Sequence, residues 1–362
     1  MDFEKFLNDD ITTLSEEIVT FFGQPLTPEV LEEYPVHMLV TEFLGHHEDV
    51  GDFEAIEKLQ QTLIDHNSDF FQQVKGFFVN YLVKYYCFKQ DAEKVEHYLK
   101  LYVDGYEDYD LLLLTMHEAL FYGYTNVVDE LIESLYERVK NDQSLVEGAS
   151  IDFILFKFSI ELEKVYHQYQ QTSADPDWGA LQEKMAQYDF DLKQDFLEVI
   201  KGGMLHSGEN VSQEFLSGFP IHKQPILGAL QIIFMKYIHS KGCSFVLSAM
   251  IWNDLGAYWT NRKSSNWTQF FDIEKDSFIE FARSKGGMMM DYRNHIALLV
   301  WGSAYVIEFL HAIQLYNEET YQQQMAKVAS IKQEFKEAYN IDLWQYSFVW
   351  QWEPLAGFKT TL

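Results

Sequence analysis

The chain has 362 residues, of which 47% are apolar, and it carries 56 acidic against 27 basic side chains, a net charge of −29 with neutral histidine. Its apolar content, which includes 29 Phe, 22 Tyr and 8 Trp, excludes global disorder and predicts a folded protein. An acidic surface repels phosphate backbones and anionic headgroups, so binding to nucleic acid or to a membrane is disfavoured. At roughly 100–200 residues per domain, the length predicts two domains or one extended array.

The acidic excess lies mainly in the first half of the chain. Residues 1–181 hold 11 basic and 36 acidic side chains, a net charge of −25, whereas residues 182–362 hold 16 and 20, a net charge of −4. An acidic surface attracts basic segments, so the first half is expected to meet a basic partner. The alternative is that the charge only keeps an aromatic-rich protein soluble.

The cysteines and the apolar segments bear on the compartment. Cys87 and Cys243 are too few for a disulfide framework or a four-thiolate zinc site, which favours a reducing compartment. Residues 1–17 lack the basic flank and the continuous apolar run of a signal peptide. Residues 226–235 and 296–307 are interrupted or too short to cross about 30 Å of hydrocarbon. We therefore expect a cytoplasmic protein without a membrane-spanning helix.

Helical periodicity runs along almost the whole chain. Apolar residues recur at spacings of three and four, and hairpin turns between alternating runs are nearly absent, so the predicted fold class is all-α. In residues 126–140 the stripe is formed by Val127, Val128, Leu131, Ile132, Leu135, Tyr136 and Val139. Breakers predict helix ends at residues 24–28, 33–35, 51, 173–178, 202–208, 218–225 and 285–287. Residues 346–352 are predicted to form a terminal helix or a docked tail.

One apolar pattern occurs twice, 33 positions apart. The corresponding residues are Val95, Tyr98, Leu99 and Tyr102 in the first copy and Val128, Leu131, Ile132 and Leu135 in the second. With the preceding helix and a short turn, each copy predicts a helical hairpin of about 33–34 residues. Residues 54–64 are predicted as the second helix of an earlier hairpin, and residues 151–169 with 178–188 as a later hairpin with a wider loop.

Over about residues 50–190 the chain therefore resembles tetratricopeptide-type (TPR-like) helical repeats, in its period and in Gly123 at the turn. It departs from the family at Val128, where an alanine is expected, and no proline closes either unit; armadillo and HEAT arrays share the same general features. The resemblance implies a concave groove, lined mainly by first helices, that holds a peptide or a partner segment. By analogy the groove residues are Asn80, Lys84, Thr115, His117 and Glu118.

The second half has a different character. Seven of the eight tryptophans lie beyond position 250, and residues 226–239, 245–259 and 288–316 form long, almost wholly apolar stretches. These features predict a helical bundle over residues 206–362 that follows an acidic helical-repeat region over residues 1–205. One continuous superhelix is the alternative. Trp301, within an apolar helix, is predicted to be buried.

Acid–base chemistry has one candidate pair. Asp291 and His295 lie four residues apart, so a helix would place them on one face, where the carboxylate could orient the imidazole. No nucleophile motif accompanies them, and the simpler interpretation is a helix-capping aspartate and a packed histidine. This pair marks a possible ligand site rather than a predicted catalytic one.

Other clusters predict no metal, phosphate or base-stacking site. Glu308 and His311 have the Glu-x-x-His spacing of di-iron helices but lack the second motif, and residues 46–49 read as a helix end. The Lys-Gly-Gly runs at 201–203 and 285–287 lack the phosphate-loop pattern and are predicted as helix stops. The aromatic residues between 252 and 271 are predicted as core, with a recognition patch as the alternative.

The predicted function is a protein-interaction module without catalysis, cofactor or metal, which binds a basic protein or peptide. Beside the groove residues, the candidate contacts are Glu130, Glu133 and Glu137, which lie opposite the apolar stripe of their helix. One alternative is an immunity- or inhibitor-type protein whose acidic half imitates a polyanion and neutralises a basic enzyme. Another is a small-ligand binder or enzyme that uses the C-terminal bundle.

Overall fold

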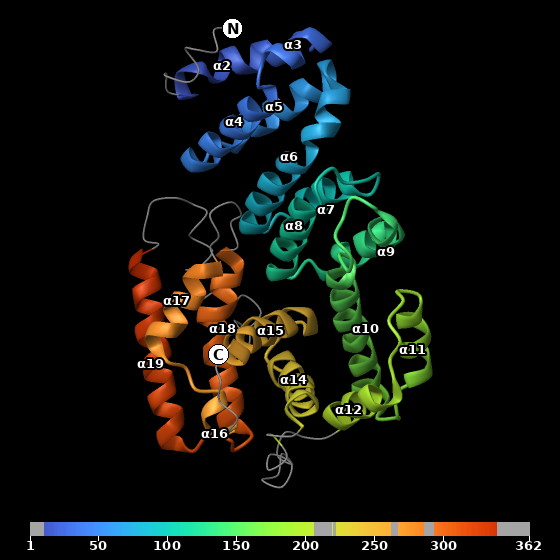
Figure 1. The fold of residues 1–362 in the computed structure, drawn as a ribbon, viewed down its shortest axis with the longest axis vertical. Helices are drawn as coiled ribbons and strands as arrows, with labels where there is room; N and C mark the ends of the chain where they lie inside the picture. The colour runs from blue at the N-terminus through green and yellow to red at the C-terminus, as the bar shows by residue number, and fades with distance from the viewer. Residues whose placement is uncertain (1–10, 206–218, 220–221, 262–266, 286–292, 339–362) are drawn as a thin grey trace. The chain divides into compact units, whose positions relative to one another are not determined.

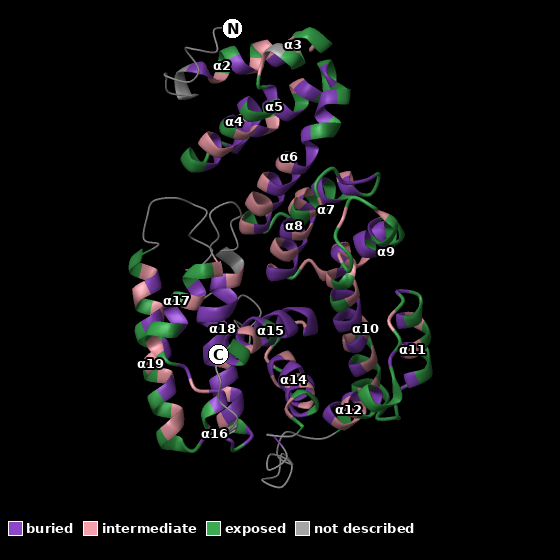
Figure 2. Ribbon diagram, viewed as in Figure 1, coloured by how far each residue is buried: buried purple, intermediate pink, exposed green. Residues whose placement is uncertain are grey.

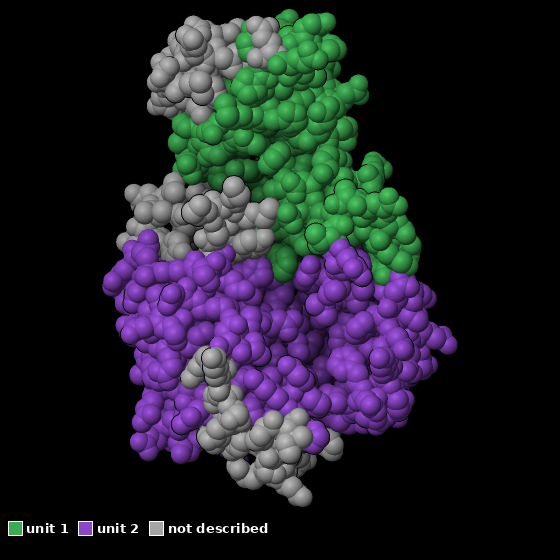
Figure 3. Space-filling view, viewed as in Figure 1, with its two compact units in different colours: residues 1–146, 341–348 green, residues 147–340, 349–362 purple. Residues whose placement is uncertain are grey.

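The computed structural model describes residues 11–205, 219, 222–261, 267–285 and 293–338 (Figure 1). Every regular element within these ranges is a helix and none is a strand, which confirms the all-α class. Residue contacts divide the chain into two compact units (Figure 3). Unit 1 comprises residues 1–146 and 341–348, and unit 2 comprises residues 147–340 and 349–362. The tail predicted at residues 346–352 lies outside the described residues.

Unit 1 is built from short helices connected by tight turns. They are α2 (Ile11–Phe22), α3 (Pro28–Glu33), α4 (Val36–Val50), α5 (Phe53–His66), α6 (Ser68–Lys89), α7 (Ala92–Leu99), the 3-10 helix η1 (Lys100–Tyr102), α8 (Tyr109–Phe121) and α9 (Thr125–Asn141). Helix α6 contacts α4, α5, α7 and α8, and α9 contacts both α7 and α8. Helix α6 is therefore central to the packing of this unit.

Two of the turns in unit 1 have the same capping geometry. Gly51 and Gln90 end α4 and α6 in the left-handed conformation, with φ of 74° and 58°. The next residue is an aspartate in each case, and the side chains of Asp52 and Asp91 accept hydrogen bonds from backbone amides in the first turns of α5 and α7. A left-handed C-terminal residue followed by an aspartate N-cap reverses the chain within two residues. Gly123, with φ of 88°, lies in the turn between α8 and α9.

Helix α9 has the amphipathic form that the sequence predicts. Its buried residues are Val128, Leu131, Ile132, Leu135, Tyr136 and Val139. Glu130, Glu133 and Glu137 are exposed, and Figure 2 shows both buried and exposed residues along α9. The apolar face therefore packs into unit 1 while the carboxylates remain in water.

The described residues of unit 2 also form helices. They are α10 (Ile151–Thr172), α11 (Trp178–Ala186), α12 (Gln194–Leu205), α14 (Lys223–His239), α15 (Phe245–Asn261), α16 (Trp267–Phe270), α17 (Lys275–Lys285), α18 (Arg293–Ala312) and α19 (Glu318–Ala338). Buried residues dominate α15 and α18 (Figure 2). Trp301 in α18 is 1% exposed, which confirms its predicted burial.

The division between the units differs from the predicted boundary between residues 205 and 206, which falls inside unit 2. One hydrophobic cluster explains the difference, because it joins helices on both sides of that boundary. Its members include Phe158 and Leu162 of α10, Met204 of α12, Ile232 of α14 and Phe245 of α15. The predicted boundary thus separates helices that share a core.

Helix α12 does not stop at Gly202 and Gly203, so the helix end predicted there is wrong. A Cβ atom at Gly203 would lie 2.7 Å from Cβ of Ile232 and 3.2 Å from the carbonyl oxygen of Ala229. Gly203 therefore permits a close approach of α12 to α14, whereas a Cβ atom at Gly202 would meet nothing within 4 Å. Helix α17 is described as far as Lys285, and the glycines after it, where a helix stop was predicted, lie outside the described residues.

One helix in the described ranges is long and apolar enough to cross a membrane, over residues 295–312 of α18. Its length and composition alone give it this property. Of that window, 72% is buried inside the structure. Burial in the core of unit 2 accounts for its apolar composition without a bilayer.

Candidate functional site

The exposed surface of unit 1 is strongly acidic. Among its described residues, 24 acidic but only 7 basic side chains are wholly or partly exposed. Two lysines of the unit are turned toward its carboxylates. The buried Lys75 donates to the carbonyl oxygen of Gly105 at 3.0 Å and pairs with Glu107 at 3.1 Å, and the half-buried Lys84 pairs with Glu48 at 2.9 Å. Only Lys75 is fully withdrawn from the surface, so the low positive charge follows mainly from the small number of basic residues in this part of the sequence.

Glu57 of α5 gathers three donors from the neighbouring helices. Its Oε1 accepts hydrogen bonds from Tyr86 at 2.7 Å, from Lys94 at 2.8 Å and from Tyr98 at 2.6 Å. Burial opposes ionisation of the carboxyl, but these hydrogen bonds outweigh it and hold the pKa of Glu57 below its usual value. The carboxylate therefore connects α5, α6 and α7 through charge-assisted bonds.

The predicted groove residues are mostly interior. Asn80 and Thr115 are buried, and the amide of Asn80 donates to the hydroxyl of Thr115 at 3.1 Å between α6 and α8. Lys84 is engaged by Glu48, while His117 and Glu118 are half-buried. The structure thus brings Asn80 and Thr115 together as a packing contact. Of the predicted partner-binding residues, Glu130, Glu133 and Glu137 are the exposed ones.

The two cysteines are free and fully buried thiols. Burial raises the pKa of Cys87 well above its usual value, and the charge of Glu118 acts in the same direction. Burial likewise raises the pKa of Cys243 to about 12. A thiol that stays protonated at neutral pH is a poor nucleophile. Neither cysteine is therefore arranged for thiolate catalysis.

His295 in α18 forms a carboxylate–imidazole pair with a residue that the sequence did not indicate. Its Nδ1 lies 2.8 Å from Oδ2 of Asp254 in α15, whereas the predicted partner Asp291 lies outside the described residues. Burial raises the pKa of Asp152 in α10, and the nearby His295 opposes that shift. His295 thus contacts the aspartate of α15 directly and is influenced by the charge of a second aspartate on α10.

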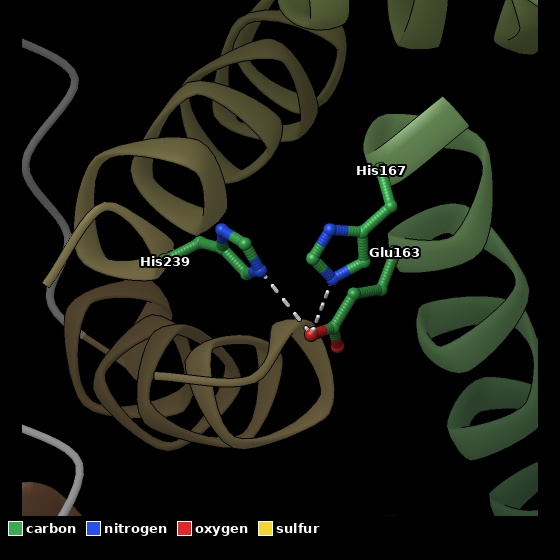
Figure 4. Close-up of side chains that lie close together, drawn as sticks. All are labelled: Glu163, His167 and His239. Carbon is green, nitrogen blue, oxygen red and sulfur yellow. Dashed lines mark ion pairs between the residues drawn. The ribbon is translucent and has the colours of Figure 1, made fainter. Parts of the chain in front are cut away.

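A second imidazole–carboxylate cluster lies where α10 approaches α14. Glu163 and His167 are four residues apart on α10, and His239 is the last residue of α14 (Figure 4). Oε1 of Glu163 lies 3.3 Å from Nε2 of His239 and 3.8 Å from Nε2 of His167. The three donor atoms all lie within 4.8 Å of one another. The residues thus offer the nitrogen and oxygen donors that a transition metal accepts.

The sequence contained only half of the signal for this cluster. The four-residue spacing of Glu163 and His167 places both on one face of a helix, which can be read from the sequence. His239 belongs to a different helix, and only the packing of α14 near α10 brings its ring to them. The sequence does not show that α14 packs near α10, and this tertiary contact was needed to identify the cluster.

The other candidate metal ligands are engaged elsewhere. His311 pairs with Glu318 at 3.2 Å and Glu308 pairs with Lys241 at 3.1 Å, so the Glu-x-x-His residues face different partners. His47 is buried, and its Nε2 lies 2.8 Å from the hydroxyl of Ser15. These contacts join neighbouring helices of their own units.

Helices α12, α14 and α15 also border a cleft of about 590 Å³. Its described lining residues are Asp195, Phe196, Val199, Gln224, Pro225, Leu227, Gly228, Gln231, Trp252, Asn253, Gly256 and Thr260. Asp195 is the single ionisable side chain among them. Its described lining therefore shows no second titratable group beside Asp195.

Comparison with known proteins gives no relative for this chain. No family model matches it, and no curated protein or solved structure is significantly similar. The functional proposals for this chain therefore depend on its own residues, their distances and their burial.

Proposed function

We propose that unit 1 is a TPR-like helical-hairpin module that binds a basic protein or peptide and performs no catalysis. The repeat interpretation is supported by the two turns at Gly51–Asp52 and Gln90–Asp91, which share one geometry. It is also supported by the successive contacts of α4 with α6 and of α6 with α8. Glu57 connects α5 to α7, and α7 contacts α9, so the second helices also follow one another.

The observation that carries this proposal is the charge of the exposed surface, 24 acidic against 7 basic side chains in unit 1. A surface of one sign raises the local concentration of oppositely charged partners and accelerates their association. The same surface disfavours polyanions. A partner rich in lysine and arginine fits it best.

We place the main contact on the outer face of α9 rather than in a groove between first helices. Asn80 and Thr115 are buried, so a partner would have to break the core to reach them. Glu130, Glu133 and Glu137 are exposed and follow the helical spacing of three and four residues, which aligns them along one face. Basic side chains on an extended or helical peptide can pair with such a row.

The proposed setting is the cytoplasm. Cys87 and Cys243 are separate buried thiols, which suits a compartment where disulfides do not form. The partner is accordingly sought among cytoplasmic proteins.

The test is affinity capture of partners by the immobilised full chain, followed by association kinetics with each captured protein. The triple variant Glu130→Lys, Glu133→Lys and Glu137→Lys should slow association, and added salt should slow it further because the Debye length is about 8 Å at physiological ionic strength. The matched control carries the same charge change on exposed residues of unit 2, namely Glu183→Lys, Glu198→Lys and Glu280→Lys.

Three outcomes are informative. Capture of a basic protein whose association is slowed by the α9 variant and not by the control supports the proposal. If that protein is an enzyme inactivated on binding, the module acts as an inhibitor. Partners that respond equally to both variants, or to neither, would contradict recognition by the α9 face.

A further inference from the structure

We propose that Glu163, His167 and His239 bind a first-row transition-metal ion, with Zn²⁺ as the expected occupant. The three side chains converge from α10 and the end of α14 (Figure 4). Two imidazoles with one carboxylate form a donor set that zinc accepts when a fourth position is left to water or a ligand. This site belongs to unit 2 and is independent of the proposed binding of a basic partner by unit 1.

The distances suit a tetrahedral ion after small side-chain movements. Zinc lies about 2.0–2.1 Å from nitrogen and oxygen ligands, so tetrahedral ligand atoms stand about 3.3–3.4 Å apart. Oε1 of Glu163 is 3.3 Å from His239 Nε2 and 3.8 Å from His167 Nε2. The half-exposed ring of His167 is the one that must move inward, and it has the freedom to do so.

The surroundings already hold two of the three ligands in position. The second carboxylate oxygen of Glu163, Oε2, accepts a hydrogen bond of 2.8 Å from the backbone amide of Phe245. The His239 ring lies edge-on to the rings of Tyr166 and Phe245, with centroids 5.4 and 5.3 Å away. Outer contacts of this kind orient metal ligands and reduce the conformational entropy lost on binding.

Electrostatics and access also favour a cation here. His239 is the final residue of α14, and the C-terminal end of a helix carries partial negative charge from the helix dipole. The side chains of Glu163 and His239 are 18% and 16% exposed, whereas that of His167 is 50% exposed, so an ion can enter from the side of His167. The fourth coordination position would then face solvent and exchange its ligand readily.

The donor chemistry selects among metals. Mg²⁺ and Ca²⁺ prefer oxygen ligands, so two imidazoles disfavour them. Zn²⁺, Co²⁺, Ni²⁺ and Cu²⁺ all accept imidazole nitrogen, and among these zinc prefers tetrahedral coordination. The competing explanation is that Glu163 only pairs with the histidines and joins α10 to the start of α15.

Calorimetric titration of ZnCl₂ into the full-length protein distinguishes the two explanations. Excess Mg²⁺ in the buffer occupies exposed carboxylates, so the remaining signal reports imidazole-containing sites. The wild type should bind one zinc ion that His167→Ala and His239→Ala each weaken at least tenfold. His311→Ala, which removes a histidine from the surface pair with Glu318, is the matched control and should leave binding unchanged.

Two further measurements keep the proposal open to refutation even if one variant folds poorly. Co²⁺ should give the visible absorption of a tetrahedral site in the wild type and lose it in His167→Ala, whose exposed side chain contributes little to folding. Zn²⁺ should also raise the unfolding temperature of the wild type more than that of His167→Ala. Absence of zinc binding to the wild type, or equal binding by the wild type and both histidine variants, would overturn the site.

Discussion

Unit 1 and unit 2 place their charges differently. In the described part of unit 1 the wholly or partly exposed side chains include 24 acidic and 7 basic ones, whereas in the described part of unit 2 they include 20 and 13. Unit 2 instead brings ionisable groups together at helix junctions, as in the pair of Asp254 with His295 and the cluster around Glu163. The acidic surface of unit 1 therefore exceeds what packing uses, which agrees with the recognition proposed for it. The clusters of unit 2 combine packing contacts with the donor groups of the proposed metal site.

The largest expected effect tests the apolar core of unit 2. Trp301→Ala should lower the free energy of unfolding by about 3–5 kcal/mol, because the side chain is 1% exposed and its removal leaves a cavity. Urea unfolding followed by tryptophan fluorescence measures this change, since five of the eight tryptophans lie in the described part of unit 2. Leu155→Ala, at a side chain that is 41% exposed, is the control and should cost much less. An unchanged midpoint for Trp301→Ala would place that residue outside the core.

A smaller effect separates two adjacent glycines of α12. Gly203→Ala should destabilise unit 2 by about 1–3 kcal/mol, because the new Cβ would press against Ile232 and the backbone of Ala229. Gly202→Ala should stabilise it by about 0.5–1 kcal/mol, since its Cβ meets nothing and alanine favours a helix interior. Opposite signs in urea unfolding would confirm the close approach of α12 and α14. Equal effects would contradict it.

These glycines also show which features of the fold can be predicted from the sequence and which cannot. The helix of residues 126–140 and its buried stripe followed from apolar spacing, because that pattern is local. The Lys-Gly-Gly run that includes Gly203 predicted a helix end, but α12 continues through Gly203, which packs closely against Ile232. The buried contact of Asn80 with Thr115 and the position of His239 beside Glu163 also depend on tertiary contacts, which the sequence pattern does not show. Apolar periodicity identifies which face of a helix is buried but not which helix packs against that face.

A third prediction examines the carboxylate that connects the helices of unit 1. Glu57→Gln should reduce stability by about 1 kcal/mol at neutral pH, because the charged acceptor of three hydrogen bonds becomes neutral. The folded-state pKa of Glu57 lies below its unfolded value, so this contribution is present above about pH 4.3 and is lost as the pH falls through the folded pKa. Far-ultraviolet circular dichroism of both proteins in urea at several pH values measures it. A difference that grows on acidification would show that the carboxylate is not held in its charged form.

The smallest effect on stability is expected for three substitutions on α9, which are also expected to have the largest effect on partner binding. Glu130→Lys, Glu133→Lys and Glu137→Lys should each change the free energy of unfolding by no more than about 0.5 kcal/mol, because all three side chains are exposed on the face of α9 opposite its buried stripe. The triple variant also reduces the repulsion within a surface that holds 24 acidic side chains, which offsets the loss of favourable pairs such as that of Glu137 with Lys140. Circular dichroism in urea provides the measurement. Substantial destabilisation would mean that the acidic face supports the fold of unit 1, and the contrast between the two units would then lie in packing rather than in recognition.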